Sequence, residues 1–298
     1  IEGTASVVLG GVIAAMKVVG ERANTAAPKV ADQTFLFLGA GEAGVGIADL
    51  IARYIIVEAK REGRTVTPDE ARSKIWLVDS KGLIVSSRTN LVEHKQRYAH
   101  DWKMGGTPPT TLEDAVDALK PTTIIGVAAQ PNTFTPSILK KMAKENDHPV
   151  VFALSNPTSK CECTAEEAYK YTGGRAIFAT GSPFDDVVID GKTYSTGQGN
   201  NAYIFPGVGL GAIVAKATSV HDDDFLVAAE TLANRVDLSV AVKSGNIYPN
   251  LEEVRDVSRE IGVAVGKFIV ETGRSKLAGG ENMEKLVEEY MWSYNDDE

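Results

Sequence analysis

One stretch, FLFLGAGEAGVGIADL at residues 35–50, limits the fold of this chain more than any other part of the sequence. The apolar run 34–39 is closed by a glycine and predicts a short buried parallel strand, and the residues after it predict a helix. Between the two stand Gly39, Gly41 and Gly44, in the G-x-G-x-x-G spacing of a dinucleotide-binding turn. A strand, a tight glycine turn and a helix in that order predict the first unit of an α/β fold.

The alternation of strand and helix continues along the chain. Four further apolar runs predict strands at residues 74–80, 122–129, 149–157 and 175–182. Two of the intervening helices start with a capping box, at Thr67–Glu70 and Thr164–Glu167. Alternation over residues 34–182 predicts an α/β protein with an open, mainly parallel Rossmann-type sheet and helices on both faces.

The pattern changes near residue 200. From Tyr203 onward helical sequence dominates, and apolar side chains recur at helical spacing in residues 251–273. We therefore divide the chain into a nucleotide-binding Rossmann domain, residues 1–200, and a C-terminal helical segment, residues 201–298.

Composition excludes several function classes. A formal net charge of −9 argues against nucleic acid as a partner. Two cysteines, Cys161 and Cys163, form no disulfide framework, and the four histidines show no metal-ligand spacing, so a reduced intracellular compartment is expected. Residues 1–20 are apolar but interrupted by Glu2 and Lys17, so they predict a buried helix and neither a membrane span nor a signal peptide.

The glycine turn is by itself a weak signal, because a glycine-rich strand–helix corner can form without any ligand. Its context favours a pyrophosphate site, since the free N–H groups of a helix start attract an anion. The second predicted strand ends at Asp79, the kind of acid that binds ribose hydroxyls. The predicted cofactor-binding turn comprises Gly39, Ala40, Gly41, Glu42, Ala43 and Gly44.

Polar and basic residues follow Asp79 in the sequence. They are Ser80, Lys81, Arg88, Lys95 and Arg97. A hydroxyl group or a cation near the ribose-binding acid suits a cofactor with a 2′-phosphate. A solvated basic loop is the alternative reading for any one of these residues.

Several longer stretches resemble the eukaryotic-type malic enzymes, the decarboxylating malate dehydrogenases. They are GTASVVLGG, FLFLGAGEAGVGIADLIA, KIWLVDSKGLIVSSR, VVFALSNPTSKCECTAEEAY, GRAIFATGSPF and GQGNNAYIFPGVGLG. The resemblance runs from residue 1 to about residue 270. It implies oxidation of (S)-malate by NAD(P)+, followed by loss of CO2, assisted by Mn²⁺ or Mg²⁺, to give pyruvate.

The resemblance also implies which cofactor is bound. The family's glycine turn and acid match residues 39–44 and Asp79. Ser80 follows the acid, as it tends to in the NADP forms, and Lys95, ahead of RYAH, looks like the lysine that marks those forms. We therefore expect NADP, with NAD as the alternative. The predicted cofactor site is completed by Val127, Ala128 and Asn156.

Substrate contacts follow from the same resemblance. Asn156, in SNPT, corresponds to a residue near the substrate and the nicotinamide, and Asn200 and Asn201, in GQGNN, correspond to amides that bond the substrate carboxylate. In this family the metal ligands, the general-base Lys, the acid Tyr and a substrate-binding Arg precede the I-x-GTAS motif. We therefore expect no catalytic residue and no metal ligand in this chain, and no turnover of malate by the chain alone.

Three hypotheses on function stay open at this point. The first is the NAD(P)-binding part of an NADP-dependent malic enzyme. The second is a non-catalytic dinucleotide-binding module, and the third is another 2-hydroxy-acid or amino-acid dehydrogenase on the same fold. The expected partners are a small-molecule substrate, malate or pyruvate, and further copies of the full-length chain, with no nucleic acid and no membrane. The sequence does not distinguish cytoplasm, plastid and mitochondrion.

Overall fold

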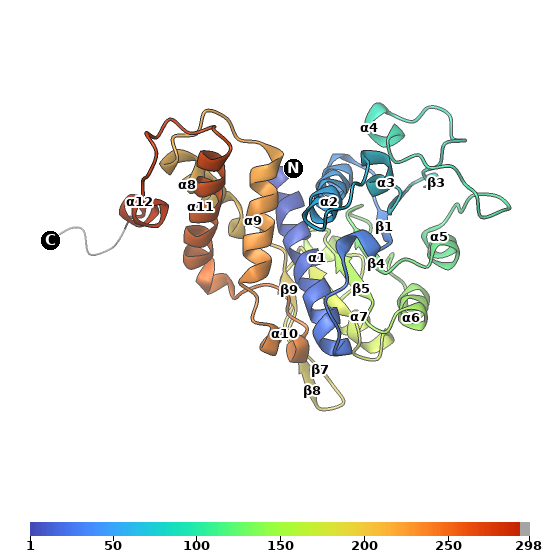
Figure 1. Cartoon of the computed structure of the whole chain (residues 1–298). Helices are drawn as coiled ribbons and strands as arrows, with labels where there is room; N and C mark the ends of the chain where they lie inside the picture. The colour runs from blue at the N-terminus through green and yellow to red at the C-terminus, as the bar shows by residue number, and fades with distance from the viewer. Residues whose placement is uncertain (293–298) are drawn as a thin grey trace.

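A seven-stranded sheet is the central element of the computed structural model, which describes residues 1–292 (Figure 1). The strand order is β3-β2-β1-β4-β5-β6-β9, and neighbours run parallel except for the antiparallel pair β2 and β3. The strands of the sheet are β1 (Phe35–Leu38), β2 (Ile75–Asp79), β3 (Gly82–Leu83), β4 (Thr123–Gly126), β5 (Val150–Ala153), β6 (Ile177–Thr180) and β9 (Gly197–Gln198). Two further strands, β7 (Val187–Ile189) and β8 (Lys192–Tyr194), form a separate antiparallel hairpin.

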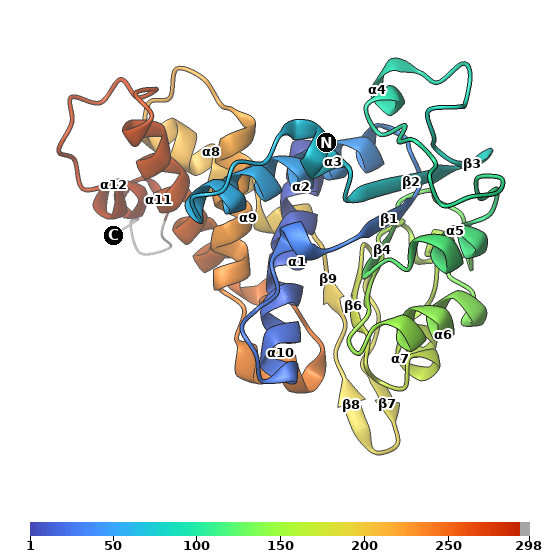
Figure 2. The ribbon, with the colours of Figure 1, turned by 45° about the vertical axis from the view of Figure 1, so that its right-hand side comes forward.

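Helices cover both faces of the sheet, because successive side chains of a strand point to opposite sides. Phe35 and Phe37 of β1 join the core formed with the first two long helices, whereas Leu36 and Leu38 join the core formed with the helices of the other face. The first face is covered by α1 (Glu2–Ala23) and α2 (Glu42–Arg61), and the other by α5 (Leu112–Leu119), α6 (Pro136–Glu145) and α7 (Ala165–Tyr171). Figures 1 and 2 show these two layers on either side of the strands.

The sequence-based fold class is confirmed. All five predicted strands are present as β1, β2, β4, β5 and β6, each shorter than predicted, and both predicted capping boxes form, at Thr67 and Thr164. The prediction missed β3, β7, β8 and β9, which are only two or three residues long. Strands this short show no period of alternation in the sequence, and their pairing depends on the partner strand that the fold brings alongside.

Helices make up most of the chain after residue 200. They are α8 (Phe205–Val214), α9 (Asp222–Asn234), α10 (Leu238–Ser244), α11 (Val254–Glu271) and α12 (Met283–Tyr290). Two short helices, α3 (Pro68–Arg72) and α4 (Glu93–Gln96), lie beside the sheet. The division at residue 200 stays a prediction, and residues 293–298 of the predicted segment lie outside the described residues.

Helix α1 lies between the sheet and the C-terminal helices, in contact with both α2 and α9 (Figure 1). By length and composition it could cross a membrane, but 83% of its most apolar window is buried inside the protein. The prediction of a buried N-terminal helix is therefore confirmed. In contrast, α8 leaves two apolar side chains exposed, Phe205 at 50% and Ile213 at 57%.

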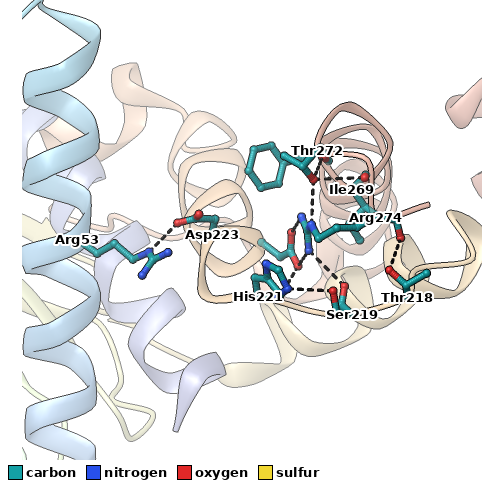
Figure 3. A network of polar contacts seen from close by, with 10 residues as sticks. Arg53, Thr218, Ser219, His221, Asp223, Ile269, Thr272 and Arg274 are labelled. Atoms are coloured by element: carbon teal, nitrogen blue, oxygen red, sulfur yellow. Dashed lines mark hydrogen bonds and ion pairs between the residues drawn. The ribbon is translucent and has the colours of Figure 1, made fainter.

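A buried ion pair ties the end of α11 to the start of α9 (Figure 3). Both guanidinium NH2 groups of Arg274 donate to Asp224, at 2.6 and 2.8 Å, and Asp224 is completely buried. Arg274 also donates to the carbonyl oxygen of Ser219 and the hydroxyl of Thr272. In the same figure Arg53 of α2 reaches Asp223 of α9, at 2.6 Å. These pairs connect the C-terminal helices to each other and to α2.

Removing the arginine of this pair should destabilise the protein strongly. We expect Arg274→Leu to lower the free energy of unfolding by about 3–5 kcal/mol, because it leaves the buried Asp224 carboxylate without its counter-charge. Urea denaturation followed by circular dichroism measures this change. Arg259→Gln is the matched control, since its pair with Asp256 is exposed on α11 and should contribute less than about 1 kcal/mol. Equal losses for the two variants would contradict the prediction.

Candidate functional site

A crevice opens at the carboxyl edge of the sheet, between the ends of β1 and β4. β1 leads to α2 on one face of the sheet, and β4 leads to α6 on the other face. A crevice forms between neighbouring strands whose connections go to opposite faces. A cavity of about 510 Å³ lies here. It is lined by Leu38, Gly39, Ala40, Gly41, Val78, Asp79, Ser80, Val92, His94, Lys95, Val127, Ala128 and Gln130.

The glycine turn forms one wall of this cavity. Gly39 has a φ of +113°, and a Cβ there would lie 2.9 Å from the carbonyl carbon of Val127, so only glycine fits. Gly41 is the N-cap of α2, and a Cβ there would meet no atom within 4 Å. The open space at Gly41 faces the start of a helix whose first N–H groups have no partner inside the helix, and this arrangement suits a phosphate.

Of the four remaining residues of the turn, only Ala40 lines the cavity. Gly44 packs against the turn itself, because a Cβ there would lie 2.4 Å from the Gly39 carbonyl oxygen. Ala40 lines the cavity, whereas Glu42 and Ala43, the first residues of α2, are exposed and do not line it. Their side chains contribute nothing to this wall, and only their backbone could serve an anion.

Asp79 lies at the end of β2 between two cations. Arg88 donates to both of its carboxylate oxygens at 3.0 Å, and Lys95 of α4 donates to one of them at 2.9 Å. The backbone N–H of Lys81 donates to Asp79 at 2.9 Å as well. The side chains of these three ionic partners are 13–21% exposed, so the cluster is largely desolvated and carries one net positive charge.

The surroundings of Asp79 lower the pKa of its carboxyl group. Burial alone would raise the pKa of its carboxyl group, but the hydrogen bonds from Arg88, Lys95 and the Lys81 backbone outweigh burial and lower the pKa from 3.8 to about 2. Asp79 is therefore ionised at neutral pH, and Arg88 and Lys95 stay fixed beside it.

The cluster includes one residue that the predicted site lacked. Arg88 belongs to the basic residues noted after Asp79, but nothing in its spacing singles it out. The antiparallel turn from β2 into β3 reverses the chain, and the guanidinium group of Arg88 returns to Asp79 as a result. Val92, His94 and Gln130 also line the cavity without having been predicted, because a cavity wall leaves no pattern in the sequence.

The asparagines predicted to bind substrate lie at the same edge but do not line this cavity. Asn156 is exposed in the loop after β5, and Asn200 and Asn201 follow β9. The side-chain oxygen of Asn200 accepts a hydrogen bond from the backbone of Ala202 at 2.9 Å, so its NH2 group is the part that could donate to a ligand. Their role as substrate ligands stays a prediction.

Within residues 1–292 no group of three or more His, Cys, Asp or Glu side chains is arranged to hold a metal ion. The acidic residues at the start of α9 have other partners, since Asp223 pairs with Arg53 and Asp224 with Arg274. Cys161 and Cys163 are both buried and free, and burial raises the pKa of each thiol.

Known proteins resemble the whole of this chain. A family model described as "Malic enzyme, NAD binding domain" matches residues 1–270. NADP-dependent malic enzyme 2 of Arabidopsis thaliana is 50% identical over 295 residues, which are 98% of this chain and 47% of the relative. NADP-dependent malic enzyme of Rattus norvegicus is 45% identical over 303 residues, which are 100% of this chain and 49% of the relative. The chain thus spans about half the length of the curated relatives it matches.

Solved structures agree with the fold. The malic enzyme from Pyrococcus horikoshii Ot3 superposes with a TM-score of 0.68 at 25% identity, covering 97% of this chain and 57% of that one. The Entamoeba histolytica malic enzyme also gives a TM-score of 0.68, at 22% identity, covering 96% of this chain and 51% of that one. At this identity the second match supports the architecture alone.

The cluster around Asp79 predicts a dependence of stability on pH. The folded-state pKa lies below the ordinary 3.8, so ionised Asp79 stabilises the fold at neutral pH, and this contribution is lost as the pH falls from about 4 to about 2. We expect the difference in free energy of unfolding between wild type and Asp79→Asn to change by about 2 kcal/mol over that range. Urea denaturation of both proteins at each pH measures this difference in free energy of unfolding.

Asp69→Asn is the control for this experiment, because it removes one negative charge from a side chain that is 97% exposed. If wild type and Asp79→Asn lost stability in parallel between pH 4 and pH 2, the ion pairs of Asp79 would not stabilise the fold, and the assignment of the cluster would be wrong.

Proposed function

This chain belongs to the malic enzyme family, as its NAD-binding domain, and we propose that it holds NADP+ in an enzyme that oxidises (S)-malate and releases CO2 and pyruvate. The observation that carries the proposal is the cation pair Arg88 and Lys95 around Asp79, in the cavity that the glycine turn lines. The relatives' dependence on NADP supports the same cofactor.

The choice of NADP over NAD follows from charge. A free acid at the end of β2 would accept hydrogen bonds from the ribose hydroxyls of NAD and repel a 2′-phosphate. Here the acid is already paired with two cations, and the cluster of Asp79, Arg88 and Lys95 keeps one positive charge in excess. A 2′-phosphate could therefore accept charge-assisted hydrogen bonds from Lys95, and from the hydroxyl of Ser80, which also lines the cavity.

The residues present fit the pyrophosphate and the adenosine half of the dinucleotide. The turn Gly39–Gly44 and the start of α2 would hold the pyrophosphate, and Asp79, Ser80 and Lys95 the adenosine ribose and its phosphate. Val127 and Ala128 would form the opposite wall. Bound NADP+ supplies the hydride acceptor for the oxidation step.

Substrate contacts would come from the same edge of the sheet. Asn156 follows β5, and Asn200 and Asn201 follow β9, which pairs in parallel with β6 next to β5. We propose that these amides orient malate by hydrogen bonds to its carboxylate, which neutral donors can do without placing another charge in the site. The described residues hold no candidate metal cluster. We therefore propose that the Mn²⁺ or Mg²⁺ ligands, the general-base Lys and the acid Tyr come from the other half of the enzyme.

The full-length enzyme is proposed to be a soluble, intracellular homo-oligomer. Exposed apolar side chains on α8, Phe205 and Ile213, support the expectation that this helical layer contacts further protein.

Removing the lysine of the cation pair should change the cofactor preference. We expect Lys95→Ala to weaken NADPH binding about 10- to 100-fold, the effect of one lost charge-assisted hydrogen bond, and to leave NADH binding nearly unchanged. Nucleotide fluorescence titrations of the 298-residue chain give both dissociation constants. Lys144→Ala, an exposed lysine on α6, controls for the change in net charge. Equal losses for NADPH and NADH would refute the role of Lys95.

Two glycines of the turn should respond differently to the same added methyl group. Gly41→Ala should keep the free energy of unfolding within about 1 kcal/mol, because its Cβ meets no protein atom, yet weaken NADPH binding at least about tenfold by filling the space of the pyrophosphate. Gly39→Ala should destabilise the fold by more than about 1 kcal/mol, because of its positive φ and the contact with Val127. Unchanged NADPH affinity in a folded Gly41→Ala chain would contradict the proposed pyrophosphate position.

A further inference from the structure

Glu162 is a completely buried carboxyl group that has no part in the site described so far. It lies between the short turn η2 (Thr158–Lys160) and α7, and it packs on the last residue of β4, where a Cβ on Gly126 would lie 2.4 Å from its Cγ and Cδ. No salt bridge to Glu162 forms among residues 1–292, and each of its carboxyl oxygens accepts a hydrogen bond from Ser155. Burying an acidic group without a counter-ion costs free energy of folding. The position of Glu162 beside β4 therefore indicates a role that offsets this cost.

A chain of hydrogen bonds leads from Glu162 to the cavity. The hydroxyl of Ser155, itself buried, donates to Glu162 Oε1, and the backbone N–H of Ser155 donates to Oε2 at 3.3 Å. The backbone N–H of Ala129 in turn donates to Ser155 Oγ at 2.9 Å. We call Glu162, Ser155 and Ala129 the relay. It connects the loop after β5 to the loop after β4.

Ala129 is the residue of the relay whose backbone is strained. Its φ is +53°, in the left-handed region that residues with a Cβ rarely adopt. Such a conformation persists only when the surroundings fix it. In this loop the N–H group of Ala129 is held by its hydrogen bond to Ser155, which supports the left-handed conformation.

The bend lies in the wall of the cavity. Val127 and Ala128, before it, and Gln130, after it, all line the cavity opposite the glycine turn. Ser155, at the other end of the same hydrogen bond, is followed directly by Asn156. A change in the relay would therefore displace a cofactor wall and the loop that carries a proposed substrate ligand.

We propose that Glu162 and Ser155 are positioning residues, which hold the left-handed bend at Ala129 and with it the coenzyme wall formed by Val127 and Ala128. This inference rests on the proposed function, because it takes the cavity to be the NADP(H) site.

The first test removes the central hydroxyl. Ser155→Ala in the 298-residue chain should weaken NADPH binding about tenfold and speed amide hydrogen exchange at Ala129 about tenfold or more, as expected for one lost buried hydrogen bond. Ser6→Ala is the matched control, since Ser6 is equally a buried serine with a hydrogen bond, at 2.7 Å to Phe225. It should lower stability but change neither NADPH affinity nor exchange at Ala129.

The second test removes the strain. Glycine adopts a φ of +53° without penalty, so in an Ala129→Gly background the added Ser155→Ala change should weaken NADPH binding only about two- to threefold. Glu162→Leu should weaken NADPH binding in the wild-type background as Ser155→Ala does, because Ser155 then lacks its acceptor.

The outcomes separate the two proposals. NADPH affinity unchanged by Ser155→Ala, or faster exchange at Ala129 with no loss of affinity, would show that the relay is only structural and would overturn the inference. An equal loss for Ser155→Ala with and without Ala129→Gly would overturn it too. A wild-type chain that binds neither NADPH nor NADH would overturn the proposed function itself.

Discussion

The strands β2, β1, β4, β5 and β6 run parallel, and two consequences of that alignment account for most of this structure. A parallel sheet is covered on both faces, so its strands are mostly apolar, and α1 and α2 pack on one side and α5, α6 and α7 on the other. The carboxyl ends of parallel strands also meet at one edge. The glycine turn after β1, Asp79 at the end of β2 and the bend after β4 are neighbours for this reason alone.

A cluster of three charged side chains, Asp79, Arg88 and Lys95, lies at this edge of a largely apolar sheet. Asp79 is mostly buried, and burial opposes its charge, yet Arg88 and Lys95 keep it ionised. The same two cations that stabilise the carboxylate leave a positive excess in the cavity, so one cluster both supports the fold and favours a phosphate. The chain as a whole has a net charge of −9, so the positive charge of this cavity comes from the local arrangement of side chains.

The C-terminal helices are joined to the layer of α1 and α2 by packing and by ion pairs. α1 packs against α9, and Arg53 of α2 pairs with Asp223 on the first turn of α9, one residue before the buried partner of Arg274. On the opposite wall of the cavity, the relay of Glu162, Ser155 and Ala129 connects the loops after β4 and β5 through the hydroxyl group of Ser155.

The sequence by itself determined the parts of this protein that depend on local patterns. Short apolar runs predicted the five main strands, the spacing of Gly39, Gly41 and Gly44 predicted the turn, and Asp79 was recognised as the acid at the end of β2. Tertiary structure alone decided the pairing of the two-residue strands, the return of Arg88 to Asp79 and the contact of Glu162 with Ser155. The physical reason is range: periodicity and turn propensity act between near neighbours in the chain, whereas these contacts depend on the path that each connection takes over the edge of the assembled sheet.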